Sequence, residues 1–178
     1  MKSLLLPLLF VLIGFSSCNS LSKLTQFEKS ISTTVVIPVD ATLVPIPISV
    51  ASPEIKTDMA KFLSDNKIDT TLIEKVSLKK LVMTVTAPVA DTCNFNFLGT
   101  IEVSIYAPDN SLIKIASLSN VPANKTIELN VESVDLKKII LKDPIKLGFK
   151  ITCKQAIKSD YTVVVTPTFL LDVNVLGL

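Results

Sequence analysis

The stretch "YTVVVTPTFLLDVNV", residues 161–175, decides the fold. Every second side chain in it is apolar, and this period of two is typical of a half-buried β-strand. Pro167 interrupts the alternation and has no backbone N–H for a sheet, so we expect a bend or bulge near it. The inward face of this long strand is expected to comprise Tyr161, Val163, Val165, Phe169, Leu171, Val173 and Val175.

The same alternation recurs through the chain at a spacing typical of hairpins. The further strands are expected within residues 31–39, 42–50, 76–87, 95–107, 112–118, 127–131 and 145–153. In the 76–87 segment the apolar parity changes at Lys79–Lys80, which predicts a β-bulge there. In "TLVPIPISV", residues 42–50, Pro45 and Pro47 share one parity, which predicts an edge strand.

One segment has helical spacing. In "SPEIKTDMAKFLSDN", residues 52–66, the apolar stripe has intervals of four, seven and eight residues and consists of Ile55, Met59, Phe62 and Leu63. With Ser52 as cap and Pro53 at the first helical position, this predicts an amphipathic helix near residues 53–64. A shorter capped helix is expected in "SVDLKKIIL", residues 133–141.

These elements predict a mainly all-β domain over residues 31–178. Strands do not alternate regularly with helices, which argues against a parallel βαβ sheet. An antiparallel two-sheet β-sandwich of about eight strands fits the pattern best. The alternative is a barrel-like closed or elongated sheet.

The N-terminal segment has the pattern of an export signal. After Lys2 comes an apolar run, Leu4 to Phe15, that holds 12 residues. A bilayer-spanning helix needs about 20 residues, so this run matches the core of a secretory signal. The small residues Ser16 and Ser17 follow it, and we therefore interpret residues 1–17 as a signal peptide.

The end of this segment, "FSSC" (Phe15 to Cys18), resembles a bacterial lipobox of the looser type found in Bacteroidota. The resemblance implies cleavage before Cys18 and lipidation of Cys18 with several acyl chains, palmitate among them. The polar residues 18–30 would then be a lipidated tether. The alternative is an ordinary signal peptide followed by a chance cysteine.

By the same resemblance, Asn19 favours the outer membrane over the inner one. The lack of acidic residues just after Cys18 favours its periplasmic face over the cell surface. The "FNFL" element, Phe95–Leu98, is loosely similar to one in β-sandwich lipoproteins of Bacteroidota to which no function is assigned. In "DTT", residues 69–71, Thr70 resembles the O-glycosylation acceptor of envelope proteins in that group.

Cys93 and Cys153 remain once Cys18 is lipidated. Both have the apolar parity of their segments, and an exported protein can form disulfides. One possibility is a Cys93–Cys153 disulfide across the core, and the other is two separate buried thiols.

Composition argues against several functions. All 18 basic residues are Lys, there is no His and no Trp, and the net charge is +2. Without His or Arg, a catalytic triad, a zinc site and base-specific nucleic-acid recognition lack their usual side chains. We therefore expect no enzyme activity, no cofactor, no metal and no nucleic-acid partner.

Two functions stay open. The first is a structural or protein-interaction module, anchored to the membrane by lipid and bound to an envelope protein. The second is a carrier of an apolar, lipid-like ligand between its sheets. A cavity of about 300 Å³ or more between the sheets would favour the carrier, and a packed interior would favour the interaction module.

Overall fold

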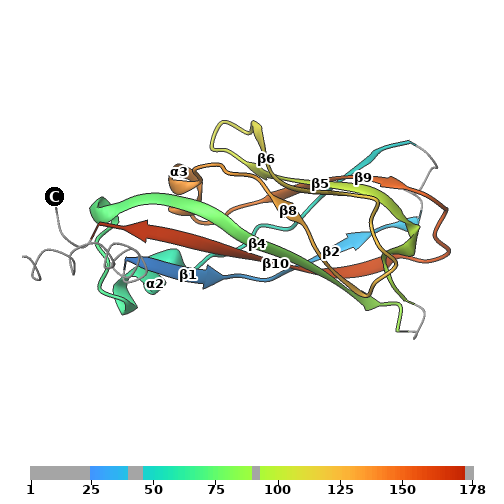
Figure 1. Ribbon diagram of the computed structural model, residues 1–178, viewed down its shortest axis with the longest axis horizontal. Coiled ribbons are helices and arrows are strands. Elements are labelled where there is room, and N and C mark those ends of the chain that lie inside the picture. Colours follow the sequence, from blue (N-terminus) through green and yellow to red (C-terminus); the bar gives the residue numbers. More distant parts are fainter. Residues whose placement is uncertain (1–24, 40–45, 90–92, 175–178) are drawn as a thin grey trace, which may run out of the picture.

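The computed structural model describes residues 25–39, 46–89 and 93–174. Over this part of the chain, two antiparallel sheets of five strands each pack face to face (Figure 1). The mainly-β sandwich is therefore confirmed, with ten strands where we expected about eight. The described strands form two separate sheets, so the closed-barrel alternative is wrong.

Sheet A is organised around the long C-terminal strand. Its strands are β1 (Gln26–Ser30), β2 (Thr33–Ile37), β4 (Ile73–Ala87), β7 (Thr126–Glu128) and β10 (Tyr161–Val173). Strand β10 pairs with β4 along one side and with both β1 and β2 along the other, and β7 adds to the far side of β4. Figure 1 shows β4 and β10 running side by side along the length of the molecule.

The expected bulge lies where the sequence places it. In the β4–β10 ladder Thr168 pairs with Lys80 and Phe169 pairs with Leu78, so Lys79 is the extra residue. This shift is close to Pro167, which itself stays in register opposite Leu81. Val175, the last residue of the expected strand, lies outside the described residues.

The N-terminal edge of sheet A differs from expectation. Residues 26–30, which we expected in the tether, form β1 and pair with β10. The single strand expected over 31–39 is β2, limited to residues 33–37. Both strands share one partner, because β10 is long enough to pair with each of them in turn.

Sheet B contains β3 (Ile48–Ala51), β5 (Leu98–Tyr106), β6 (Leu112–Ser119), β8 (Asn130–Val131) and β9 (Leu147–Cys153). Their order is β3-β9-β5-β6-β8, so β3 is an edge strand, as the prolines before it predict. Pro45 lies outside the described residues. The segment expected as one strand over 127–131 is divided, since β7 joins sheet A and β8 joins sheet B.

The expected strand at residues 95–107 begins later than predicted. Phe95–Phe97 form a short 3-10 helix, in which the side chain of Asn94 accepts a hydrogen bond from the Asn96 N–H. Both phenylalanines are buried. Their spacing of two residues, which suggested a strand, therefore belongs to a helical turn that packs against the core.

The main helix is shorter than the predicted one. Helix α2 spans Met59–Asp65, whereas we expected a start at Pro53. Ser52 does not cap it: its hydroxyl accepts a hydrogen bond from the Leu147 N–H and donates to the Pro53 carbonyl. Ile55 forms a β-bridge with Ile145, so it pairs with the segment just before β9 and does not belong to the helix.

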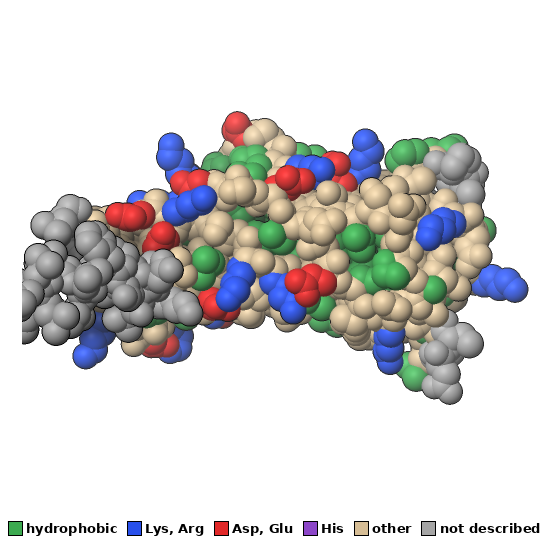
Figure 2. Space-filling model, viewed as in Figure 1, with side chains coloured by type: hydrophobic (Ala, Val, Ile, Leu, Met, Phe, Trp, Pro, Cys, Tyr) green, Lys and Arg blue, Asp and Glu red, His purple; other side chains and the backbone are tan. Residues whose placement is uncertain are grey.

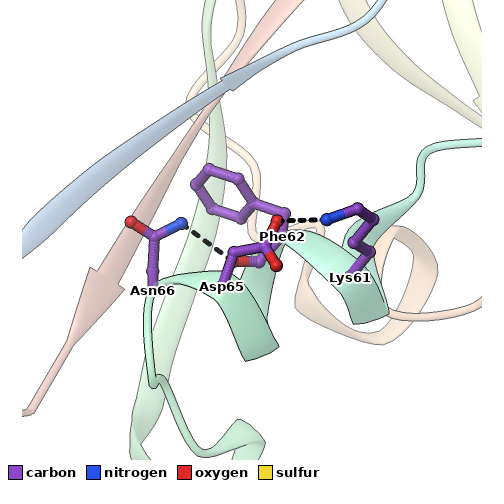
Figure 3. Close-up of polar contacts among 4 residues, drawn as sticks. All are labelled: Lys61, Phe62, Asp65 and Asn66. Carbon is purple, nitrogen blue, oxygen red and sulfur yellow. Dashed lines mark hydrogen bonds and ion pairs between the residues drawn. The ribbon is translucent and has the colours of Figure 1, made fainter.

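Local polar contacts fix the end of α2 (Figure 3). Lys61 Nζ lies 2.6 Å from a carboxylate oxygen of Asp65, one turn further along. Asn66 Nδ2 donates to the Phe62 carbonyl oxygen at 2.8 Å, and the same oxygen also accepts from the Asn66 backbone N–H at 3.2 Å. The second helix, α3 (Lys137–Ile140), confirms the short helix expected near 133–141.

The core lies between the sheets and is almost entirely aliphatic. Its largest fully buried side chains include Phe95, Phe97, Phe169, Met59, Leu81 and Met83. None of the helices formed by the described residues has the length and apolar character needed to cross a bilayer. On the face shown in Figure 2, acidic and basic side chains are interspersed.

Candidate functional site

The outer face of sheet B carries a hollow between β3, β9, β5 and β6. On β5, Ser104 pairs with Gly148 of β9, and Glu102 pairs with Lys150. On β6, Leu112 pairs with Tyr106 at the end of β5. The hollow has a volume of about 220 Å³ and is lined by Ser49, Val50, Ala51, Glu102, Ser104, Tyr106, Leu112, Gly148, Phe149 and Lys150.

Gly148 is the reason that this face is hollow. Its partners in the same row are small, Ala51 on one side and Ser104 on the other, so neither of them fills the space beside it. A Cβ atom at Gly148 would lie 3.3 Å from Leu112 Cδ2 and 3.3 Å from Tyr106 Cε2. A glycine inside a strand often marks such a close approach, and here two larger side chains lean over it.

A second hollow lies beyond Tyr106. It has a volume of about 280 Å³, and its lining comprises Glu54, Tyr106, Ala107, Pro108, Asn110, Ile139, Lys142, Pro144, Ile145 and Lys146. Tyr106 lines both hollows, so its ring lies between them. Lys146 Nζ is 5.5 Å from the centroid of that ring, within cation–π range.

The interior between the sheets is much smaller. The cavity there has a volume of about 10 Å³, roughly the space of one water molecule. All of its lining side chains are apolar: Val35, Ile37, Val50, Met83, Ile101, Phe149, Ile151 and Val163. Such a space does not accommodate an apolar ligand.

Cys93 and Cys153 are both buried and both free in the structure. Two separate buried thiols are one of the two arrangements that we considered, and the disulfide stays a prediction. Burial raises the pKa of Cys153 above its usual range. Burial also raises the pKa of Tyr161, and the negative charge on Cys93 and a hydrogen bond to it add to this shift. The Tyr161 ring packs on Phe97, with 4.3 Å between centroids.

Thr70 is exposed and lies in a 3-10 helix, Thr70–Leu72, just after α2. The Asp69 carboxylate accepts hydrogen bonds from the Thr71 N–H and the Thr71 hydroxyl. These bonds lower the pKa of Asp69 and fix the turn around Thr70. O-glycosylation of Thr70 stays a prediction. Cys18, the expected lipidation site, lies outside the described residues.

The described residues contain no group of three or more His, Cys, Asp or Glu side chains that could hold a metal ion. The polar groups that come together on sheet B are Ser104, Glu102 and Lys150. Sequence reasoning missed this site because Gly148 looked like one more outward residue of an alternating strand. The signal that could have found it is a glycine inside a strand, with Lys146 two positions before it and Lys150 two positions after it.

The fold and this surface hollow define the chain as a β-sandwich protein with an open site on one sheet. It matches no protein-family model and no curated protein. Solved structures similar to it include one from Desmodium yellow mottle tymovirus, with 14% identity, 86% of this chain and 85% of that chain covered and a TM-score of 0.33.

Another similar structure, from turnip yellow mosaic virus, has 14% identity, covers 86% of this chain and 96% of that chain, and has a TM-score of 0.28. A carbohydrate-binding module of the β-sandwich superfamily has 15% identity, covers 79% of this chain and 54% of that chain, and has a TM-score of 0.27. At such scores, the description of this fold rests on the chain's own strand order.

Proposed function

We propose that this protein is a lipid-anchored interaction module of the bacterial cell envelope. In this proposal Cys18 holds the sandwich at the periplasmic face of the outer membrane, and the outer face of sheet B binds an envelope component. The anchor rests on the signal-like segment 1–17 and on the lipobox-like sequence that ends it.

The observation that carries the binding mode is the contrast between the interior and the surface. The interior cavity is about 10 Å³, while the two hollows beside Tyr106 are about 220 and 280 Å³. Sites for ligands of drug size usually have volumes of about 300 to 1,000 Å³. Carriage of a lipid-like molecule between the sheets is therefore the weaker candidate.

Membrane fractionation tests the anchor. The Cys18→Ala variant should move from the membrane to the soluble fraction, because it lacks the acylated side chain. Cys93→Ala is the matched control, since it also removes one thiol but leaves the lipobox-like sequence intact. A Cys18→Ala protein that stays with the membrane would contradict the anchor.

Purification of the native lipoprotein from envelopes, with mass spectrometry of proteins, glycans and lipids, tests the binding mode. We expect a stoichiometric envelope component that is recovered with the wild type and lost with Gly148→Leu, which fills the hollow on sheet B. One bound lipid per protein and no other component would instead favour the carrier.

A further inference from the structure

We propose that the hollow on sheet B binds a neutral saccharide, with one sugar ring held between Tyr106, Leu112 and the hydroxyl of Ser104. This inference rests on the proposed function, because it names the chemistry that the exterior site recognises. Four observations carry it: a hydroxyl open to the hollow, a mixture of charges, an exposed apolar rim and the size of the space.

Ser104 is the exception among the buried polar side chains. The described residues contain three of them, Ser52, Thr57 and Ser104, which are 3%, 1% and 8% exposed. Ser52 bonds to the backbone of Leu147 and Pro53, and Thr57 accepts from the Met59 N–H. The Ser104 hydroxyl has no hydrogen-bond partner within the described part of the chain and lines the hollow.

The Ser104 oxygen is open to the hollow, because no side-chain N or O atom of the described residues is both fully buried and without a hydrogen-bond partner. Because Ser104 lies at the floor of an open hollow, a bound molecule can supply that partner. The hydrogen-bond partner of the Ser104 hydroxyl must fit beside Gly148, and it must donate or accept a hydrogen bond there. A sugar hydroxyl does both, whereas the aliphatic chain of a lipid does neither.

The charges around the hollow argue against a charged ligand. Glu102 and Lys150 are direct partners on the β5–β9 ladder and both line it. Neither forms an ion pair with another described residue. An anion would meet the Glu102 carboxylate, and a cation would meet the Lys150 ammonium. A neutral polyol suits both, since its hydroxyls donate to the carboxylate and accept from the ammonium.

The rim supplies the apolar half of the recognition. Leu112 is 57% exposed, although it is a large aliphatic side chain, and Tyr106 is half-buried beside it. An aromatic ring has a negative face that attracts the slightly positive C–H groups of a sugar ring. Exposed apolar side chains that border polar groups are typical of ligand sites.

The space limits the ligand to a ring or a short chain. A hollow of about 220 Å³ lies below the range for ligands of drug size, so it suits a single ring. The second hollow, of about 280 Å³ beyond Tyr106, lies where a following sugar would extend, and it offers Asn110 and Glu54 as polar partners. The geometry therefore points to an oligosaccharide that passes Tyr106.

The experiment uses the two tyrosines as internal probes. The full-length protein in detergent micelles has only Tyr106 and Tyr161, so selective ¹³C labelling of tyrosine gives two signals, and Tyr161→Phe assigns them. Maltohexaose, cellohexaose and chitotetraose are titrated to millimolar concentration, with an acidic oligogalacturonate for comparison. We expect a saturable shift of the Tyr106 signal with a neutral sugar, while the Tyr161 signal, from sheet A, stays in place.

Calorimetric titration of variants then tests the contacts. Ser104→Ala should weaken binding by about tenfold, the usual scale for one hydrogen bond of this kind. The matched control is Ser117→Ala, which removes a hydroxyl from the neighbouring strand β6 outside the lining of the hollow. Tyr106→Phe should keep the affinity within about threefold, because the ring remains, while Tyr106→Ala should abolish binding.

Three results would overturn the saccharide proposal: no saturable Tyr106 shift with any neutral sugar, equal losses in Ser104→Ala and Ser117→Ala, or stronger binding of the oligogalacturonate. Failure here is separable from failure of the proposed function. If Gly148→Leu loses its envelope partner while no sugar binds, the exterior site stands and its ligand is not a neutral saccharide. An unchanged Tyr161 signal in each variant shows that the sandwich is intact.

Discussion

Ser104 of β5 and Gly148 of β9 are direct partners across the ladder of sheet B. Their short side chains leave room on the outer face, into which the Tyr106 and Leu112 side chains lean. Their inward neighbours Val103 and Phe149 are buried in the core. At this pair the inner surface of the sheet is therefore fully packed, while the outer surface keeps a hollow.

The two glycines of sheet B should respond differently to alanine. At Gly148 the new Cβ would meet the ends of two side chains, which can move, so we expect a change in the free energy of unfolding within about 1 kcal/mol. At Gly99 the Cβ would lie 3.2 Å from the Thr152 carbonyl oxygen, which is fixed in the sheet. Gly99→Ala should therefore cost about 1 to 3 kcal/mol.

Urea unfolding of Gly148→Ala and Gly99→Ala measures these changes in stability, and each variant serves as the control for the other. Equal losses of stability would show that Leu112 and Tyr106 are held as rigidly as backbone, against the open site described above.

The bulge at Lys79 should tolerate both substitution and deletion. The Lys79 ammonium pairs with Glu28 and the Lys80 ammonium pairs with Glu128, and all four side chains are about half exposed. Exposed ion pairs contribute about 0 to 1 kcal/mol, so Lys79→Ala should cost less than 1 kcal/mol on that scale. Deletion of Lys79 removes the bulge but leaves Lys80 alone between the buried Leu78 and Leu81, so the inward face is kept. Deletion of Ser77, which is in register, would instead turn Val76 toward solvent.

Chemical denaturation distinguishes the Lys79 and Ser77 deletion variants. A Ser77 deletion variant as stable as the Lys79 deletion variant would mean that β4 slips without penalty, which the buried Leu78 and Val76 argue against.

Phe169 should be among the most costly side chains to truncate. It is fully buried in β10 between the sheets. Phe169→Ala should destabilise the protein by about 3 to 5 kcal/mol, through lost burial and the cavity it leaves. Leu112→Ala is the control, because this exposed leucine should change stability by only about 0.5 kcal/mol. Thermal unfolding measures both, and similar losses would contradict the assigned core.

Stability should fall at alkaline pH through Tyr161 and Cys153. Burial raises the pKa of both groups, so the folded state keeps these protons when the unfolded chain has begun to lose them. The free energy of unfolding is therefore unaffected below the unfolded-chain pKa values, about 8.5 for Cys and 10 for Tyr. It declines as the pH rises from these values through the folded-state pKa values.

Unfolding by urea at neutral and alkaline pH, compared between wild type and the Tyr161→Phe, Cys153→Ala double variant, measures this decline. The double variant should lose less stability on the alkaline side. In a Tyr106→Phe background, ultraviolet titration of the remaining phenol should show the Tyr161 pKa above its usual range, and Cys93→Ala should lower it. If the free energy of unfolding fell equally with alkaline pH in the wild type and the double variant, Tyr161 and Cys153 would not be the cause of the decline.

The strands and the bulge could be predicted because burial on one face imposes a period of two on the sequence. The change of parity at Lys79–Lys80 and the long strand ending the chain both follow from that rule. The start of the main helix could not be predicted from the sequence, because Ser52 and Pro53 also suit an extended segment. There the bonds of Ser52 to Leu147 and of Ile55 to Ile145 outweigh the local helical preference.

The candidate site was hidden for a different reason. Ser104 and Gly148 are 44 positions apart, and neither belongs to a motif. Alternation shows which residues point outward, but it does not show which outward residues of separate strands share a row. That relation depends on the register of β5 against β9, which appears only in the folded structure.

Strand β10 lies at the centre of sheet A, yet the ribosome makes it after every other described strand. Strands β1, β2 and β4 all pair with it, so none of them has its main partner until residues 161–173 have been made. Sheet A therefore cannot assemble before β10 has emerged. A premature stop codon before residue 161 would leave three strands without the partner they share.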